Sequence, residues 1–287
     1  MAGDLQRGGF ARTFGMLLLR WRIQAYMDLM WMTRDAKLCL INVVSDVILN
    51  LLGVMAVFLL AERFDGIGVS TREQTIFMLG YAALVRGILV AGFGYNILQI
   101  SRRVGRGQMD HVLIQPQPIW MILLTEGFMP FSGCLSLFTG IGITAWSLTQ
   151  LSIPFVAGWG FWFFGHLVAS TTIVLAISFF WGSLAFWSPV GAEEISSQAT
   201  RLIFQLKSFP LDGLGPLLQN VLLTVLPVGF VAWYPSQTLM GIGDHSLWMT
   251  PFVAILVSLL AFVAFKKGLK HYEQTGSQRY VGWAHRS

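Results

Sequence analysis

Two long apolar runs, at residues 75–100 and 119–147, constrain the fold of this chain more than any other feature. Each run exceeds the roughly 20 residues that an α-helix needs to cross the hydrocarbon core of a bilayer. The chain is 55% hydrophobic and only 11% charged, whereas soluble domains carry about 25% charged residues. Because the apolar runs are long and continuous, they favour helices over the short alternating strands of a membrane β-barrel. We therefore predict an all-α polytopic membrane protein.

Hydropathy along the whole chain predicts six transmembrane helices. Their approximate limits are 38–61, 75–100, 119–147, 159–187, 195–208 and 251–265. The fifth segment is short and unusually polar. It contains Arg201 and Lys207, and it directly follows Glu193 and Glu194. Together these helices and their connections form one transmembrane domain, at residues 38–265.

An amphipathic helix is predicted ahead of the first span, at residues 10–32. Apolar side chains such as Phe14 and Trp21 follow one helical face, whereas Arg20 and Asp28 lie on the more polar side. A helix with separate apolar and charged faces lies in the interface of a membrane rather than across it. We assign residues 1–37 to this helix and a cytoplasmic N-terminus.

The positions of lysine and arginine predict the orientation of the chain. Fourteen of the 19 basic residues precede the first span, lie within 101–118 or follow the sixth span, whereas the loop on the opposite side holds only Arg63 and Arg72. Cytoplasmic loops are enriched in basic residues. We therefore expect both termini, the segment 101–118 and a basic tail at 266–287 to be cytoplasmic, with the chain in the cell membrane. This topology also explains the formal net charge of +5, so we predict no nucleic-acid partner.

The segment 209–243 is interrupted by four prolines, Pro210, Pro216, Pro227 and Pro235. Its apolar stretch at 217–234 has the length of a span, but Pro227 breaks the middle of it. A seventh span would also move the basic tail to the other side of the membrane. We therefore favour a re-entrant hairpin on the outer side, with a straight seventh span as the alternative.

Three ionisable residues, Asp46, Arg86 and Glu126, fall inside predicted spans. A charge at that depth costs about 2.5–3.5 kcal/mol on insertion scales, so such residues usually have a partner or a role. They could form a structural ion pair that links three spans, or a polar patch along a substrate or proton route. The sequence leaves both interpretations open. His166, in the fourth predicted span, is expected to make an interhelical hydrogen bond.

The sequence lacks the motifs of a catalytic or metal site. It contains no G-x-x-x-x-G-K-[ST] nucleotide loop, no H-E-x-x-H pair and no Cys/His cluster with metal spacing. Cys39 and Cys134 stand alone in separate apolar segments and predict no disulfide framework. We therefore predict no catalytic residue, no metal site and no cofactor bound by this chain.

The segment 101–118, SRRVGRGQMDHVLIQPQP, is the most polar interruption between two long apolar runs. Its apolar residues recur at roughly helical spacing and predict a short amphipathic helix: Val104, Met109, Val112 and Leu113. Pro116 and Pro118 end that helix before the next span. The apolar side chains could fit a groove of a partner, with the arginines and Asp110 at the rim. The same arginines could instead bind lipid headgroups.

In this layout the chain resembles the type-2 permeases of ATP-binding-cassette exporters. The matching features, in chain order, are the amphipathic N-terminal helix, the basic cytoplasmic helix, the short fifth span and the proline-rich outer hairpin. The run Arg106-Gly107…Asp110…Leu113…Pro116 looks like the coupling helix of that family. By this resemblance, the ATPase-coupling residues are Arg102, Arg103, Arg106, Met109, Asp110 and Leu113.

The resemblance implies a dimer of two identical or related permeases, together with cytoplasmic ATPase subunits that bind ATP and Mg²⁺. ATP would then drive the outward movement of an amphipathic, lipid-linked or drug-like substrate. The alternative is an ion- or proton-coupled secondary transporter that uses Asp46, Arg86 and Glu126 and needs no ATPase. We detect no internal repeat of the kind that many such transporters carry. A gene for an ATPase next to the gene of this chain would favour the exporter.

Overall fold

The computed structural model describes residues 10–63, 71–98, 100–151, 158–207, 210–211, 214–243 and 246–276. These residues form α-helices and short 3-10 turns, and no strand occurs among them. In chain order the α-helices are α1 (Phe10–Arg34), α2 (Ala36–Arg63), α3 (Arg72–Leu98), α4 (Ile100–Gly105), α5 (Met109–Leu113), α6 (Ile119–Thr125), α7 (Cys134–Gln150), α8 (Trp159–Ser183), α9 (Pro189–Leu206), α10 (Pro216–Thr224), α11 (Trp233–Met240) and α12 (Met249–Thr275). The turn η2 (Leu184–Phe186) continues α8, and η4 (Val228–Phe230) separates α10 from α11. The predicted all-α class is confirmed for the described residues.

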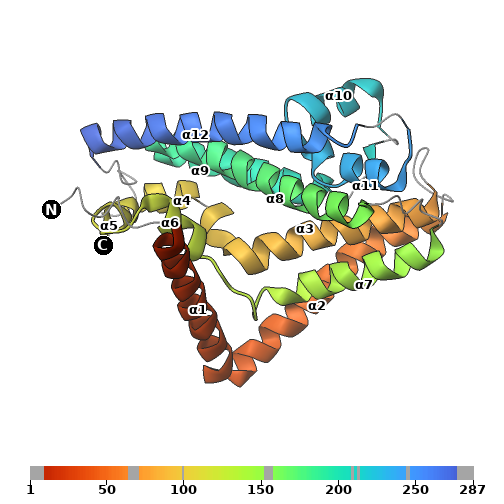
Figure 1. Cartoon of the computed structure of the whole chain (residues 1–287), viewed down its shortest axis with the longest axis horizontal. Coiled ribbons are helices and arrows are strands. Elements are labelled where there is room, and N and C mark those ends of the chain that lie inside the picture. The colour runs from red at the N-terminus through yellow and green to blue at the C-terminus, as the bar shows by residue number, and fades with distance from the viewer. Residues whose placement is uncertain are drawn as a thin grey trace.

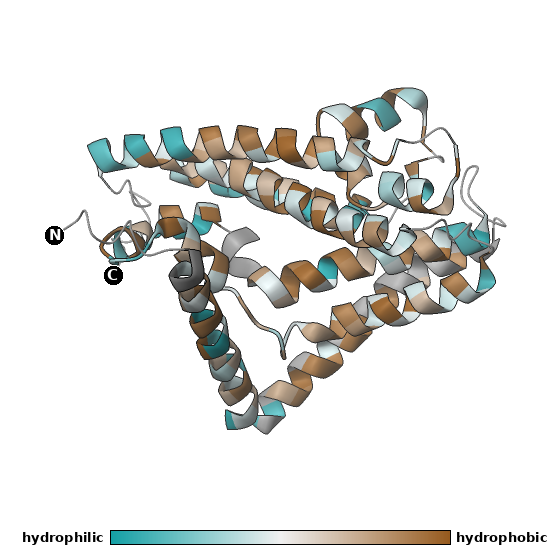
Figure 2. Ribbon diagram, in the orientation of Figure 1, coloured by the Kyte–Doolittle hydropathy of each residue, from teal (hydrophilic) through white to brown (hydrophobic). Residues whose placement is uncertain are grey.

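Three stretches of the described residues are long and apolar enough to cross a membrane: Arg72–Gly94, Trp159–Phe186 and Met249–Thr275. Figure 2 shows the middle turns of α12 coloured as hydrophobic and its last turns as hydrophilic. The protein is therefore a multi-pass membrane protein. The helix α2, with 28 residues, also has the length of a span. The total of six spans stays a prediction.

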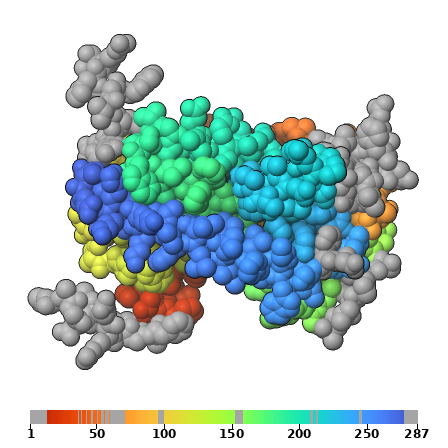
Figure 3. All heavy atoms as spheres, turned by 90° about the horizontal axis from the view of Figure 1, so that it is seen from above, coloured from red at the N-terminus to blue at the C-terminus, as the bar shows by residue number. Residues whose placement is uncertain are grey.

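The long helices α3, α8 and α12 build the main core (Figure 1). Phe77 and Tyr81 of α3 are fully buried with Ile173 of α8. The hydroxyl of Tyr81 lies 3.0 Å from that of Ser170 on α8, as expected where no water is at hand to satisfy a polar group. Figure 3 shows α12 running along the full length of one face. The helices α4, α5 and α6 gather at one end of the bundle, which we call the α5 end, and α10 and α11 gather at the other, the α10 end (Figure 1).

The third predicted span, at 119–147, is not one continuous helix. It divides into α6 and α7, and a non-helical connection at residues 126–133 separates them. Pro130 lacks a backbone N–H and cannot continue a helix. The connection instead contacts α3 where that helix kinks at Gly94, which has φ +59°, and the N–H of Met129 donates to the carbonyl oxygen of Ala91 at 2.9 Å. A side chain at Gly94 would meet the carbonyl oxygen of Gly127 at 2.5 Å.

Glycines bring the backbones of α3 and α7 into direct contact. A Cβ atom at Gly140 of α7 would meet the backbone nitrogen of Leu84 at 2.5 Å, and one at Gly80 of α3 would meet Thr144. Small residues of this kind allow membrane helices to approach closely, which strengthens van der Waals packing between them. The pairing of α3 with α7 therefore depends on the absence of side chains at these positions.

We expect Gly140→Leu to destabilise the bundle, because the new side chain has no space against Leu84. Overpacking costs about 1–3 kcal/mol where neighbours can shift, and backbone neighbours shift little. Gly142→Leu, on the open side of the same helix with no atom within 4 Å of its Cβ position, is the matched control. Thermal unfolding of the detergent-purified variants should show a lower midpoint for Gly140→Leu alone. Equal midpoints would show that the helices do not pack as described.

The fifth and sixth predicted spans have different limits from those expected at 195–208 and 251–265. The helix α9 begins at Pro189, since proline fits the first turn of a helix. Its buried face carries the small residues Ala192, Ser196 and Ala199, and α9 packs against α8 and α4. The helix α12 continues to Thr275, so the first part of the predicted tail at 266–287 is helical.

The segment 209–243 does not form a straight span in the residues described. The helices α10 and α11 contain nine and eight residues, so each rises only about 12–14 Å along its axis. Pro227 lies between them, directly before η4. Both helices lie at the α10 end of the bundle (Figure 1). Two short helices at one end agree with the predicted hairpin, and its re-entrant position in the membrane stays a prediction.

Candidate functional site

The predicted amphipathic helix at 101–118 is two short helices rather than one. The helix α4 carries Arg102 and Arg103, and α5 carries Met109 and Asp110. Between them Gly107 has φ +70°, a left-handed conformation that other residues adopt at a cost. The chain therefore turns at Gly107, and α4 and α5 form a compact unit.

This α4–α5 unit encloses a second, smaller core at the α5 end. Val104, Met109 and Val112 are exposed by only 1%, 0% and 3%, and they pack with Ile122 of α6, Phe186 of η2 and Tyr272 of α12. Leu113 is partly buried against the same cluster. The prediction that Val104, Met109 and Val112 fit a groove of a partner is therefore wrong, because the chain buries these apolar side chains itself. Burial of their apolar surface stabilises the fold by about 25 cal/mol for each Å² removed from water.

Two arginines of α4 bind carboxylates that come from other parts of the chain. Arg102 Nε donates to Glu193 Oε1 of α9 at 2.9 Å. Arg103 donates through Nη2 to Glu126 Oε2, at the end of α6, and both side chains of this pair are largely buried. The unit is thus attached to α9 on one side and to the α6–α7 connection on the other.

A third polar contact attaches the unit to α12. The hydroxyl of Tyr272 donates to Asp110 Oδ1 at 2.6 Å. The ring of Tyr272 packs against that of Phe186, with centroids 5.6 Å apart. Tyr272 lies near the end of α12, and α12 runs from the α10 end of the bundle to the α5 end. The contact therefore links α5 to a helix that reaches both ends of the bundle.

The outward face of the unit is formed by other residues than those predicted from the helical pattern. Ile114, directly after α5, is 79% exposed. Arg106 and His111 are also exposed, as is Pro116 in the turn before α6. The residues that this unit turns outward are therefore mainly polar, with Ile114 as a large exposed apolar side chain among them.

The structure describes the side chains of two of the three predicted intramembrane residues, Arg86 and Glu126. Glu126 forms an ion pair with Arg103, and no ion pair between Glu126 and Arg86 occurs among the described residues. The pairing of Arg86 with Asp46 stays a prediction. Arg86 lies instead close enough to Lys207, at the end of α9, for the two positive charges to repel each other. Lys207 is buried, and its Nζ donates to the carbonyl oxygen of Ala82 at 2.7 Å. The side chain of Asp46 lies outside the described residues.

His166 of α8 is fully buried, but the interhelical hydrogen bond predicted for it is not formed. Neither of its ring nitrogens has a hydrogen-bond partner in the described residues. The imidazole contacts the ring of Trp162, one turn earlier on the same helix.

A comparison with protein families decides the class. The model of a family described as ABC-2 family transporter protein matches residues 47–276. The chain belongs to this family. It is therefore a membrane transport protein of the ATP-binding-cassette class, as predicted from the ordered features of its sequence. No curated protein and no solved structure matches the chain.

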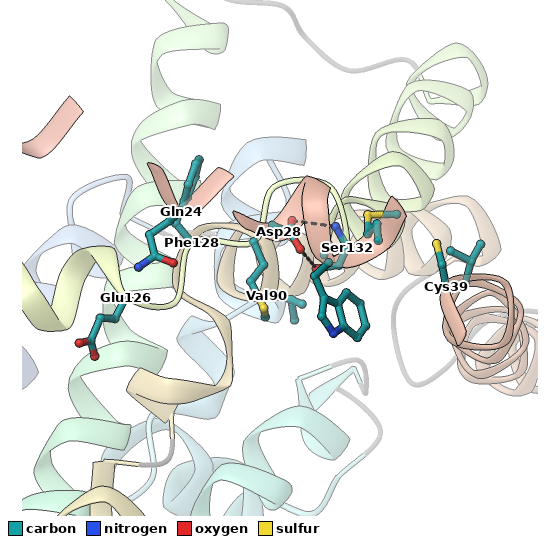
Figure 4. A pocket seen from close by; sticks show the side chains of 12 residues that line it. Gln24, Asp28, Cys39, Val90, Glu126, Phe128 and Ser132 are labelled. Carbon is teal, nitrogen blue, oxygen red and sulfur yellow. Dashed lines mark hydrogen bonds between the residues drawn. The ribbon is translucent and has the colours of Figure 1, made fainter. Parts of the chain in front are cut away.

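The ABC-2 chain also contains a pocket of about 530 Å³ between α1, α2, α3 and the α6–α7 connection (Figure 4). Gln24, Glu126 and Ser132 contribute polar groups to its lining, whereas Phe128 and Val90 contribute apolar ones. A pocket with both kinds of lining suits an amphipathic molecule.

One wall of this pocket depends on Asp28 of α1. Asp28 Oδ2 accepts hydrogen bonds from the backbone N–H groups of Phe131 and Ser132, at 2.9 and 3.1 Å, and Oδ1 accepts one from the Ser132 hydroxyl at 2.6 Å. The prediction placed Asp28 on the polar side of an interfacial helix, but it is only 8% exposed. It satisfies backbone groups that the break in the third span leaves without helical partners.

Proposed function

We propose that this ABC-2 chain is the transmembrane permease subunit of an ATP-driven exporter, and that a separate ATPase subunit acts on it through the α4–α5 unit. The observation that supports this proposal is the attachment of one small unit to three different parts of the bundle. Arg102, Arg103 and Asp110 each bind a residue from a different element. A displacement of α5 would therefore move several membrane helices at once.

The proposed contact surface consists of Arg106, His111, Ile114 and the turn at Pro116. Lipid headgroups are the other possible ligand of a basic cytoplasmic segment. However, Arg102 and Arg103 already bind carboxylates of this chain, which leaves less positive charge for headgroups. The exposed Ile114 favours a protein partner with an apolar depression over a phosphate surface.

The orientation belongs to the same proposal. Both termini and the α5 end face the cytoplasm, and α10 and α11 form the re-entrant hairpin on the outer side of the cell membrane. ATP and Mg²⁺ bind to the ATPase subunits, and a second permease, identical or related, completes the membrane part. An amphipathic, lipid-linked or drug-like substrate agrees with the mixed lining of the pocket at α1. The alternative of an ion-coupled transporter is not favoured, because the chain belongs to the ABC-2 family of transporters.

We expect co-expression with its cognate ATPase to yield a stable complex. Affinity purification of the tagged chain from membranes should retain the ATPase in stoichiometric amounts, because the family works with such subunits and the chain has no nucleotide motif of its own. The purified complex should hydrolyse ATP. Transport driven by an ion gradient in vesicles that lack the ATPase would contradict the proposal.

Single cysteines test the proposed orientation. In a background without Cys39 and Cys134, cysteines at Leu217 of α10 and Trp248 before α12, which are 79% and 69% exposed, should react with an impermeant thiol reagent added outside intact cells. A cysteine at the exposed His111 should react only after the membrane is opened. Labelling of Leu217 and Trp248 from opposite sides would show a seventh span at 217–234.

A further inference from the structure

A second groove lies on the membrane face of the bundle, between α6, α8 and α12. It has a volume of about 560 Å³, which is within the range of ligand sites in proteins. Its lining is almost wholly apolar and includes Leu123 and Leu124 of α6, Leu175 and Phe179 of α8, and Phe262 of α12. This groove is distinct from the pocket at α1, which shares none of these residues.

The length of the groove corresponds to one leaflet of a bilayer. Along α12 it extends from Ser258 to Leu269, and 11 residue steps of an α-helix rise roughly 16 Å. The hydrocarbon core of a bilayer is about 30 Å thick, so one leaflet contributes about 15 Å. The groove therefore has the length that a single layer of acyl chains fills.

One end of the groove is cationic. Lys266 of α12 is the one charged residue among the described residues that line it, and its side chain is exposed. Across the groove stands Trp120, in the first turn of α6, with an exposed fraction of 52%. Lysine and tryptophan are the residues that mark the level of lipid headgroups. Figure 3 shows α12 and the segment around residues 100–125 next to each other at this end of the face.

A shallower groove continues along the same two helices toward the α10 end. It shares Thr172, Ser258 and Phe262 with the first and ends near Pro251, and no charged residue lines it in the described residues. Among the described residues that line the two grooves, a cation thus stands only at the α5 end.

We propose that the groove between α6, α8 and α12 is a binding site for an anionic phospholipid of the cytoplasmic leaflet. One acyl chain lies along Leu124, Leu175 and Phe262, and the phosphate binds the ammonium group of Lys266. The site goes beyond the proposed export function, because it lies apart from the α4–α5 unit and the pocket at α1. It rests on the proposed orientation, in which the α5 end faces the cytoplasm. Since α6 follows the α4–α5 unit directly in the chain, a bound lipid would also hold α6 against α8 and α12.

Native mass spectrometry of the detergent-purified chain tests this proposal without the ATPase. The probes are phosphatidylglycerol and phosphatidylcholine with identical acyl chains, titrated separately. Lys266→Gln should weaken phosphatidylglycerol binding about fivefold, as expected for one lysine at an anionic headgroup, and leave phosphatidylcholine binding unchanged. Lys267→Gln, an equal loss of charge next to the groove on the same helix, is the matched control and should change neither. Ser258→Phe should fill the groove and weaken both lipids.

Equal weakening by Lys266→Gln and Lys267→Gln would overturn the proposal, because it would show an effect of bulk charge only. Wild-type binding by Ser258→Phe with an unchanged melting temperature would overturn it as well. Lys266 is exposed, so its substitution does not disturb the fold and gives a result even if Ser258→Phe fails to fold. A chain that retains its ATPase but binds both lipids equally would contradict this site and leave the export function in place.

Discussion

Ile114→Asp releases the ATPase subunit from the purified complex, if α5 docks as we propose. Ile114 is 79% exposed in this chain and follows α5 directly, so its substitution removes little internal contact. Burial of an isoleucine side chain in a partner contributes about 1.5–3 kcal/mol, and a carboxylate in the same apolar depression adds a desolvation cost. Together these effects correspond to a loss of affinity of about 100-fold or more.

The measurement is the amount of ATPase retained on the tagged chain after affinity purification. Ile114→Val keeps an apolar side chain of similar shape and should retain the ATPase as the wild type does. Thermal unfolding should give the same midpoint for both variants, which separates docking from folding. Full retention of the ATPase by Ile114→Asp would show that the outward face of α5 is not the docking surface.

Tyr272→Phe should separate ATPase binding from its effect on the bundle. The variant removes one hydroxyl, and with it the 2.6 Å hydrogen bond to Asp110, while the ring can keep its contact with Phe186. A hydrogen bond to a charged group contributes about 1.5–3 kcal/mol. Because the surface at Ile114 is unchanged, the ATPase should still bind, but the permease-dependent stimulation of ATP hydrolysis should fall about tenfold.

Tyr234→Phe is the matched control for this experiment. Tyr234 lies in α11 at the opposite end of the bundle, and its hydroxyl accepts a hydrogen bond from the N–H of Ser246 at 3.1 Å. Loss of the same group there should leave stimulation of hydrolysis near the wild-type level. If both variants lower stimulation equally, the effect is one of general stability, and the contact between α5 and α12 has no special part in coupling.

The long helices could be predicted because their sequences decide them locally. α3, α8 and α12 belong to helical segments of 23 to 28 residues, each with an apolar window long enough to cross a membrane. In lipid, a long apolar segment of this kind satisfies its own backbone groups as a helix. The division of the third span was missed because Gly127, Pro130 and Gly133 stand among apolar residues of the same run. Hydropathy reports transfer into lipid, and it does not report whether the backbone stays helical.

The segment 101–118 stays the predicted docking site, but the side chains that it turns outward differ from those that the helical pattern indicated. Spacing indicated that Val104, Met109 and Val112 share a face, and it could not indicate that Phe186 and Tyr272 cover that face. The partner of Asp110 is 162 residues away in the chain, and that of Asp28 is more than 100 residues away. Such pairings depend on how the helices pack, which no local pattern contains.

Photo-crosslinking from Ile114 tests directly whether an ATPase subunit docks on the α4–α5 unit. A photoreactive amino acid at this position, in membranes that contain the intact complex, should crosslink the chain to the ATPase. The same amino acid at Leu217 of α10, which is equally exposed at 79%, should give no crosslink to the ATPase. A crosslink from Leu217, or none from Ile114 while the ATPase remains bound, would contradict docking at this unit.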